Sequence, residues 1–160
     1  MTGDPRGWTI LAFLVMATPL WLFVVHHRLA WLRAGVAVAW DAIEDPLRRR
    51  HAVAQRLVET VRHAAPRERA TVQAVAEALD AAQASRGPGE AARTEARLGS
   101  GLARLLALAS LYPDLRQRTD FHAMQRELAE LEARIADARD PYNGRVTDYN
   151  AALWDFPFFY

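Results

Sequence analysis

The chain has 160 residues, which is enough for one domain with additional segments. Cysteine is absent, so disulfides and thiolate metal sites are excluded. The formal net charge of +1 argues against a nucleic-acid binder that depends on a strongly basic surface. Abundant Ala, Leu, Arg and Glu, with few β-branched runs, predict an all-α protein.

An apolar segment follows a short N-terminal tail, residues 1–7. Residues 8–25 carry no charged side chain, and as a helix they would span about 27 Å, close to the hydrocarbon core of about 30 Å. We therefore predict a single transmembrane helix over residues 8–27, with Trp8 and Trp31 at the two interfaces. A cleaved signal peptide and a buried core helix are the alternatives.

The arginines that flank this segment predict its orientation. Arg6 precedes it, whereas Arg28 and Arg33 follow it closely. Because basic residues are retained on the cytoplasmic side, we expect the rest of the chain to be cytoplasmic.

Residues 28–153 predict a helical bundle whose first helix continues the membrane segment. A 3.6-residue pattern of apolar side chains runs on to about Ala64, although Pro46 interrupts it and is expected to bend the helix. Pro66 suits the first turn of a second helix, which we expect to end near Ser85.

The third and fourth helices are separated by proline and glycine signals. Gly87-Pro88-Gly89 predicts a loop before the third helix. That helix should end at Tyr112-Pro113-Asp114, because the residue before a proline resists the helical conformation. Thr119 or Asp120 can cap the fourth helix.

The fourth helix carries the most regular pattern. Apolar side chains recur at intervals of three and four residues from Phe121 to Leu153, which is typical of a helix that packs along its whole length against other helices. Pro141 and Gly144 could form a turn, but the pattern keeps its phase across them, so we predict one kinked helix. The predicted fold is an antiparallel four-helix bundle with long helices.

Several motifs in the chain resemble the LemA family. They are Leu-Leu-Ala-Leu-Ala-Ser-Leu-Tyr-Pro-Asp-Leu from Leu105, Phe-x-x-Met-Gln-x-Glu-Leu from Phe121, Tyr-Asn-x-x-Val-x-x-Tyr-Asn from Tyr142, the later Phe156-Pro157, and Leu47-Arg48-Arg49-Arg50 in the first half. The resemblance implies one N-terminal membrane helix, a long-helix antiparallel bundle and no established enzymatic activity. With the apolar segment, it leads us to expect a single-pass protein of the bacterial inner membrane.

The run Arg48-Arg49-Arg50 is open to three interpretations: a solvated face, contact with a partner protein, and contact with nucleic acid. Glu44 and Asp45 stand four residues before Arg48 and Arg49, the favoured order for ion pairs along a helix. We therefore interpret the run as a solvated, self-neutralised face, with contact to a partner protein as the leading alternative. We likewise expect the charged residues of the fourth helix, Glu132 among them, to form a solvated face.

The sequence predicts no catalytic, cofactor or metal site, and we expect the protein not to be an enzyme. No acidic residue stands three positions before any of the five histidines, as a di-iron bundle requires. Glu59 and His63 have ligand-like spacing, but two ligands do not make a site.

Two groups of residues near the C-terminus are candidates for interaction. Tyr142, Asn143, Tyr149 and Asn150 either fill the seam and hydrogen-bond to neighbouring helices or form a partner-binding strip. The tail, residues 154–160, either enters the membrane interface or packs against the base of the first helix. Its aromatic residues are Trp154, Phe156, Phe158, Phe159 and Tyr160.

These observations favour a non-catalytic, membrane-tethered scaffold or adaptor that docks envelope proteins through its helix faces. The alternative is a membrane-surface organiser that self-associates and contacts lipid through the aromatic tail. We expect the lipid bilayer and an unidentified membrane or envelope protein as partners, a homo-oligomer as a further option, and no nucleic acid.

Overall fold

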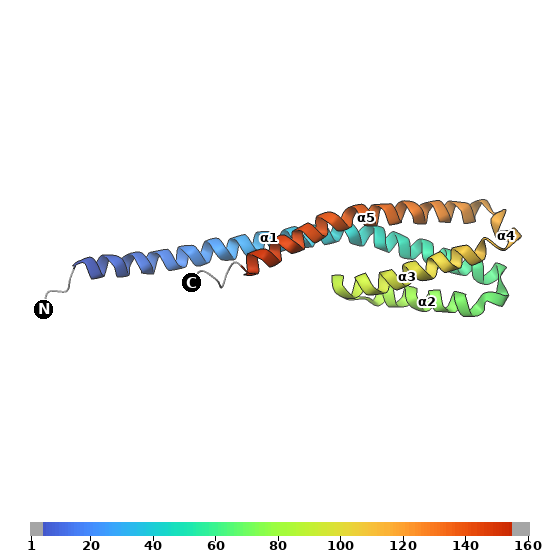
Figure 1. The fold of residues 1–160 in the computed structure, drawn as a ribbon, viewed down its shortest axis with the longest axis horizontal. Helices are drawn as coiled ribbons and strands as arrows, with labels where there is room; N and C mark the ends of the chain where they lie inside the picture. The colour runs from blue at the N-terminus through green and yellow to red at the C-terminus, as the bar shows by residue number, and fades with distance from the viewer. Residues whose placement is uncertain (1–4, 155–160) are drawn as a thin grey trace. The chain divides into compact units, whose positions relative to one another are not determined.

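The computed structural model describes residues 5–154, and the secondary structure in this range is entirely helical, which confirms the predicted all-α class (Figure 1). The helices are α1 (Pro5–Ala64), α2 (Arg69–Ala84), α3 (Pro88–Ala109), α4 (Pro113–Arg116) and α5 (Thr119–Trp154), with a 3-10 turn at Pro66–Glu68. The chain divides into two units: residues 40–140 form one, and residues 1–39 with 141–160 form the other.

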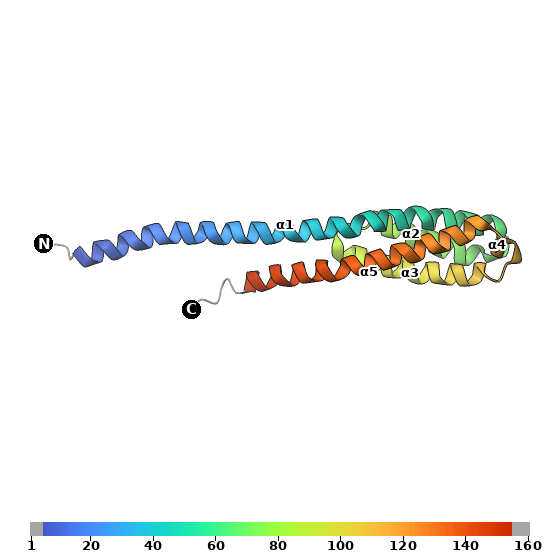
Figure 2. The same ribbon diagram turned by 90° about the horizontal axis from the view of Figure 1, so that it is seen from above.

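The unit of residues 40–140 is a helical bundle with one apolar core. In two perpendicular views α2 and α3 lie side by side (Figures 1 and 2). The core takes side chains from α1, α2, α3 and α5, and Leu57, Leu98 and Phe121 are among its most deeply buried members. Each such side chain contributes roughly 1.5–3 kcal/mol through burial, so this core supplies the main driving force for folding.

The helix α1 ends where the sequence predicts. It continues through Pro46 and ends at Ala64. Pro66 then begins the 3-10 turn, and α2 itself begins three residues later at Arg69. A proline at this point removes no hydrogen bond, because the first N–H groups of a helix have no partner within it.

The predicted loop at Gly87-Pro88-Gly89 is wrong in part. The turn between α2 and α3 consists of residues 85–87, and Gly87 has φ +82°, a conformation that glycine adopts without a steric penalty. Pro88 and Gly89 belong to the first turn of α3, where the fixed φ of proline suits a helix start. At its other end α3 stops at Ala109, and the extended Tyr112 precedes Pro113, the first residue of α4.

The helix α5 begins at Thr119 and runs through Pro141 to Trp154, which confirms one continuous helix rather than a turn. At its start, Asp120 Oδ1 accepts a hydrogen bond from the N–H of Phe121 at 2.9 Å. The Arg118 guanidinium also donates to this carboxylate, with 2.6 Å between Nη2 and Oδ2. This bond holds the pKa of Asp120 below its ordinary value.

The apolar seam of α5 is buried over only part of its length. Within residues 40–140 it is buried from Phe121 to Ile135. In the other unit, Tyr142 and Tyr149 are half-buried and Leu153 is exposed, so the prediction of packing along the whole helix is wrong there. The described helical segments of that unit belong to α1 and α5, without a third helix to cover the seam.

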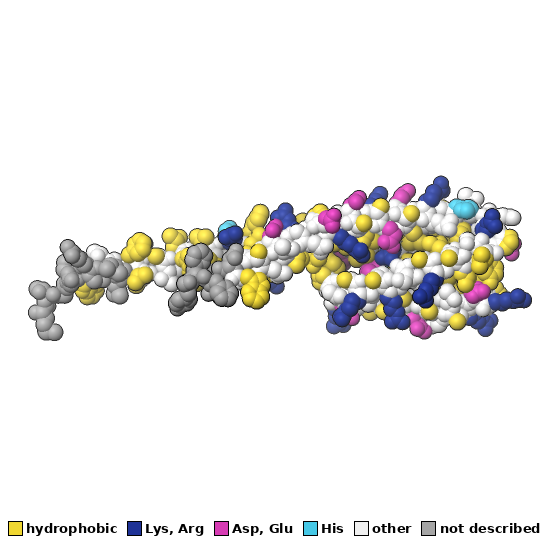
Figure 3. All heavy atoms as spheres, viewed as in Figure 1, with side chains coloured by type: hydrophobic (Ala, Val, Ile, Leu, Met, Phe, Trp, Pro, Cys, Tyr) yellow, Lys and Arg dark blue, Asp and Glu magenta, His cyan; other side chains and the backbone are white. Residues whose placement is uncertain are grey.

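The first part of α1 exposes apolar side chains over its described length. Phe13, Met16 and Phe23 are each largely exposed, and Figure 3 shows hydrophobic side chains along this segment. By length and composition α1 can cross a membrane, and its most apolar stretch has no side chain buried within the protein. The apolar side chains of this segment are therefore not covered by the rest of the described protein.

Leu98→Ala should destabilise the bundle by about 2–5 kcal/mol, because the variant leaves a cavity in the core at a side chain that is 0% exposed. Leu111→Ala is the matched control: this leucine is 79% exposed, and its loss should change stability by less than about 0.5 kcal/mol. Chemical unfolding of the detergent-solubilised chains measures both values. Equal effects would contradict the described core.

Replacing Arg118 with Gln should move the pKa of Asp120 back up toward its ordinary value of 3.8, because the hydrogen bond from Arg118 is the main cause of its lowering. A lowered pKa in the folded state means that the pair stabilises the protein above about pH 4 and loses this effect as the pH falls through the folded-state pKa. NMR titration of the carboxyl carbon tests this. Arg116→Gln is the control and should leave the titration unchanged.

Candidate functional site

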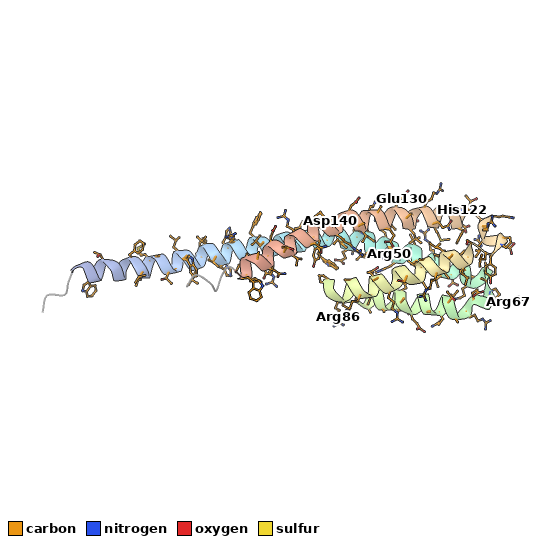
Figure 4. All side chains as sticks on the ribbon, viewed as in Figure 1. Arg50, Arg67, Arg86, His122, Glu130 and Asp140 are labelled. Atoms are coloured by element: carbon orange, nitrogen blue, oxygen red, sulfur yellow. The ribbon has the colours of Figure 1, made fainter. Side chains whose placement is uncertain are left out.

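The most unusual feature of the bundle is a buried arginine. On α1 the buried positions Leu47, Arg50, Ala54 and Leu57 follow one another at intervals of three and four, so Arg50 lies on the core face of the helix. Its side chain is only 2% exposed, and Figure 4 shows it between α1 and α3. The interpretation of Arg48-Arg49-Arg50 as one solvated face is therefore wrong for Arg50, although Arg49 does pair with Asp45 at 3.1 Å.

A buried carboxylate on α3 meets this arginine. Glu95 is 3% exposed, and its Oε2 accepts a hydrogen bond from Arg50 Nη1 at 3.0 Å. Its other oxygen, Oε1, lies 2.5 Å from Nε2 of His51, the next residue of α1. Both carboxylate oxygens are thereby bound to neighbouring residues of α1, as a buried charge requires.

The helix α5 completes the ion cluster, which consists of Arg50, His51, Glu95 and Glu132. Glu132 Oε1 lies 2.9 Å from Arg50 Nη2, and the Glu132 side chain is 52% exposed. The expectation of a purely solvated Glu132 is therefore wrong, since one of its oxygens binds the buried guanidinium. Three helices are joined through one arginine, and Glu132 is the member of the cluster that water reaches most freely.

A glycine makes room for the guanidinium. A Cβ atom built on Gly99 of α3 would lie 2.8 Å from Arg50 Nη2, closer than real Cβ contacts allow. Arg50 Nε is buried and has no hydrogen-bond partner among the described residues. The cluster therefore binds Arg50 through Nη1 and Nη2 and leaves its Nε without an acceptor within residues 5–154.

The ion cluster was not predicted from the sequence, although the positions of its residues carry a signal. Arg50 continues the apolar spacing of α1, and Glu95 continues the spacing of Ala91, Leu98 and Leu102 on α3. A charged residue on the apolar face of each of two helices predicts a buried pair, because neither charge is stable alone in a core. The position of Arg50 and Glu95 on the apolar face of each helix predicts the pair, whereas the charged residues next to them in the sequence do not.

Two open pockets border the cluster. One, of about 570 Å³, lies against α1, α2 and α3, and its lining includes Trp40, Arg48 and His51. The other, of about 510 Å³, is bordered by Arg50, by small residues of α3 and by Glu132 of α5. Glu95 lines both pockets.

The residues singled out from the sequence lie elsewhere. Tyr142 and Tyr149 are half-buried, while Asn143 and Asn150 are exposed. Trp154, the last described residue, is 70% exposed. Phe156, Phe158, Phe159 and Tyr160 lie outside the described residues.

The pair with ligand-like spacing forms a surface ion pair. His63 Nε2 lies 2.9 Å from Glu59 Oε1, and Arg62 Nη1 lies 2.7 Å from Glu59 Oε2. Within residues 5–154 no group of three or more His, Asp and Glu side chains is arranged to hold a metal ion. The polar residues of this region thus bind one another on the surface of α1.

The fold and the ion cluster together define an all-α bundle protein whose buried charges join its helices. The chain belongs to the LemA family, whose profile matches residues 39–159 and thus confirms the resemblance seen in the motifs. This range begins just before Trp40, the first residue of the bundle unit.

Three curated relatives are similar to this chain over a shorter range than the family profile. The chain is 32% identical over 62 residues to the magnetosome protein MamQ of Magnetospirillum gryphiswaldense, and 34% identical over 62 residues to MamQ 1 and MamQ 2 of Paramagnetospirillum magneticum. In each comparison the similarity covers 39% of this chain and 23% of the relative. Most of each relative therefore has no counterpart in the match.

Glu95→Ala should destabilise the bundle by about 3–5 kcal/mol, because it leaves Arg50 buried with Glu132 as its remaining carboxylate. Arg50→Met with Glu95→Leu should recover much of this loss, since an apolar pair of similar volume needs no charge partner. Glu127→Ala is the control, because the Arg56–Glu127 ion pair is exposed and is worth less than about 1 kcal/mol. Unfolding curves that do not distinguish Glu95 from Glu127 would contradict the cluster.

Proposed function

We propose that the protein is a non-catalytic, membrane-tethered scaffold or adaptor, and that an antiparallel four-helix bundle docks envelope proteins through its helix faces. The observation that carries this proposal is the exposed apolar start of α1. Its most apolar stretch, an 18-residue window, is unburied within the protein, and at about 27 Å as a helix it matches a hydrocarbon core about 30 Å thick. Membership in the LemA family supports the proposal.

The residues that follow the apolar stretch of α1 support the location that we propose for the protein. Arg28 and Arg33 follow the apolar stretch, and both are exposed on α1. The retention of basic residues on the cytoplasmic side then supports a single-pass protein of the bacterial inner membrane with its bundle in the cytoplasm. No magnetosome role is proposed, because the similarity to the MamQ proteins covers 23% of their length.

The charges inside the bundle support a non-catalytic role. Arg50 and Glu95 are buried and bind each other, so these charges are committed to joining helices. The Glu59 carboxylate is shared between Arg62 and His63 on the surface. An adaptor, in contrast, needs exposed helix faces, and α3 and α5 offer these along the bundle.

A second function is favoured by one observation. Trp154 is 70% exposed at the end of α5, directly before the aromatic residues of the tail. Tryptophan and tyrosine are favoured at the membrane interface. The alternative is therefore a membrane-surface organiser that self-associates and contacts lipid through residues 154–160.

Crosslinking and affinity capture from native membranes should distinguish the two functions. The adaptor predicts one discrete, stoichiometric partner that is captured equally by the full chain and by a variant lacking residues 154–160. Self-crosslinks and lipid alone, both lost with the tail, would instead establish the organiser and contradict the adaptor.

A variant lacking residues 8–27 serves as the control for tethering in the same experiment. It should leave the membrane fraction on alkaline extraction, while the full chain remains there. Equal extraction of both chains would contradict the tether.

A further inference from the structure

We propose that the groove between α3 and α5 binds a helix of a partner protein, and that a carboxylate of this helix replaces Glu132 on Arg50. This inference rests on the proposed adaptor function and names the docking surface and the chemistry of its partner. Four observations on residues 40–140 support it: the small side chains of the groove, the incomplete binding of Arg50, the exposure of Glu132, and a row of arginines along α3.

The groove suits a helix because its α3 side includes four small residues beside Glu95, Leu102 and Leu106. The small residues are Ala96, Gly99, Ser100 and Ala103, and Ala129 of α5 also lines the groove. Ala96, Ser100 and Ala103 are spaced at four and three residues, so they form one stripe along α3. Small side chains let a second helix axis approach closely, and the groove volume of about 510 Å³ is open to it.

Arg50 lies at this groove with part of its binding capacity unused. In a guanidinium group, Nε and Nη2 lie on the same edge, so one carboxylate can accept hydrogen bonds from both. Glu132 binds Nη2 at 2.9 Å, while Nε is buried and has no partner among the described residues. A carboxylate that bridges both atoms would therefore bind Arg50 better than Glu132 does.

Glu132 can move away from Arg50 without its own carboxylate being left buried and unpaired. Its side chain is 52% exposed, so a rotated Glu132 is hydrated at once. Glu95 remains bound to Nη1 on the opposite side of the guanidinium and holds Arg50 in place. The exchange of one carboxylate for another keeps the charge balance of the cluster.

The surface beside the groove supports an acidic partner. Arg93, Arg97 and Arg104 are exposed on α3, and none of them has an ion-pair partner among the described residues. Arg97 and Arg104 directly follow the groove residues Ala96 and Ala103 and so lie about 100° further around the helix. Basic side chains gather over this part of the bundle in Figure 3, and Arg139 of α5 also lines the groove. Acidic residues flanking the apolar stripe of a partner helix would complement this charge.

Photo-crosslinking of the full chain in native membranes tests the proposal. The probe, p-benzoylphenylalanine, replaces Ser100 in the groove or, as the matched control, the exposed Ser110 at the end of α3, outside the groove lining. We expect a discrete adduct from position 100 and none from position 110. Peptide mapping should place this adduct on a helical segment of another protein that carries acidic residues.

Charge variants then test the exchange on Arg50. Glu132→Gln should raise the adduct yield about two- to fivefold, the range expected when a half-exposed competing ion pair is removed. Glu130→Gln, an exposed position of α5 outside the groove lining, should leave the yield unchanged. Arg97→Glu with Arg104→Glu should lower it severalfold without disturbing the core, because both side chains are exposed.

Several results would overturn the proposal. They are equal adducts at both positions, adducts with a second copy of this chain or with lipid, and a lower yield in Glu132→Gln than in the unchanged protein. A partner captured from membranes but never crosslinked at position 100 would refute the groove and leave the adaptor function intact. If neither experiment yields a discrete partner, both proposals fail.

Discussion

The salt bridge between Arg50 and Glu95 is the interaction on which the arrangement of the bundle depends. Apolar burial alone specifies the register of two helices less strictly, because the hydrophobic effect has no directional preference. A buried guanidinium has such a preference: it needs Glu95 at 3.0 Å on α3 and the space that Gly99 leaves beside it. Any shift of α3 along α1 would separate two buried charges, so the pair selects one register.

The ion cluster has a buried side and a side that borders water. Inside the bundle, the carboxylate of Glu95 is bound by Arg50 and His51, and Arg50 Nε has no acceptor among the described residues. On the outer side, Glu132 supplies one oxygen from a half-exposed side chain. The same arginine thus specifies the fold through its buried side and remains able to exchange ligands through its outer side.

Much of the fold could be predicted from the sequence because apolar spacing and proline positions are local signals. The end of α1 at Ala64 and the continuous helix across Pro141 follow from them. The ion cluster could not be predicted from charge spacing alone, since Asp45 and Arg49 suggested a surface face that Arg50 does not share. The start of α3 at Pro88 was likewise not predicted, because the turn before it contains the positive φ of Gly87, which the sequence does not show.

The division of α5 into a buried and a half-buried part links the fold to the proposed function. The same apolar pattern runs from Phe121 to Leu153, but side chains are fully buried only as far as Ile135. An apolar pattern that is only half-covered fits the proposed adaptor, which needs exposed helix faces. Burial, and not the pattern, therefore separates the part of α5 that stabilises the bundle core from the part outside that core, to which the exposed Asn143 and Asn150 belong.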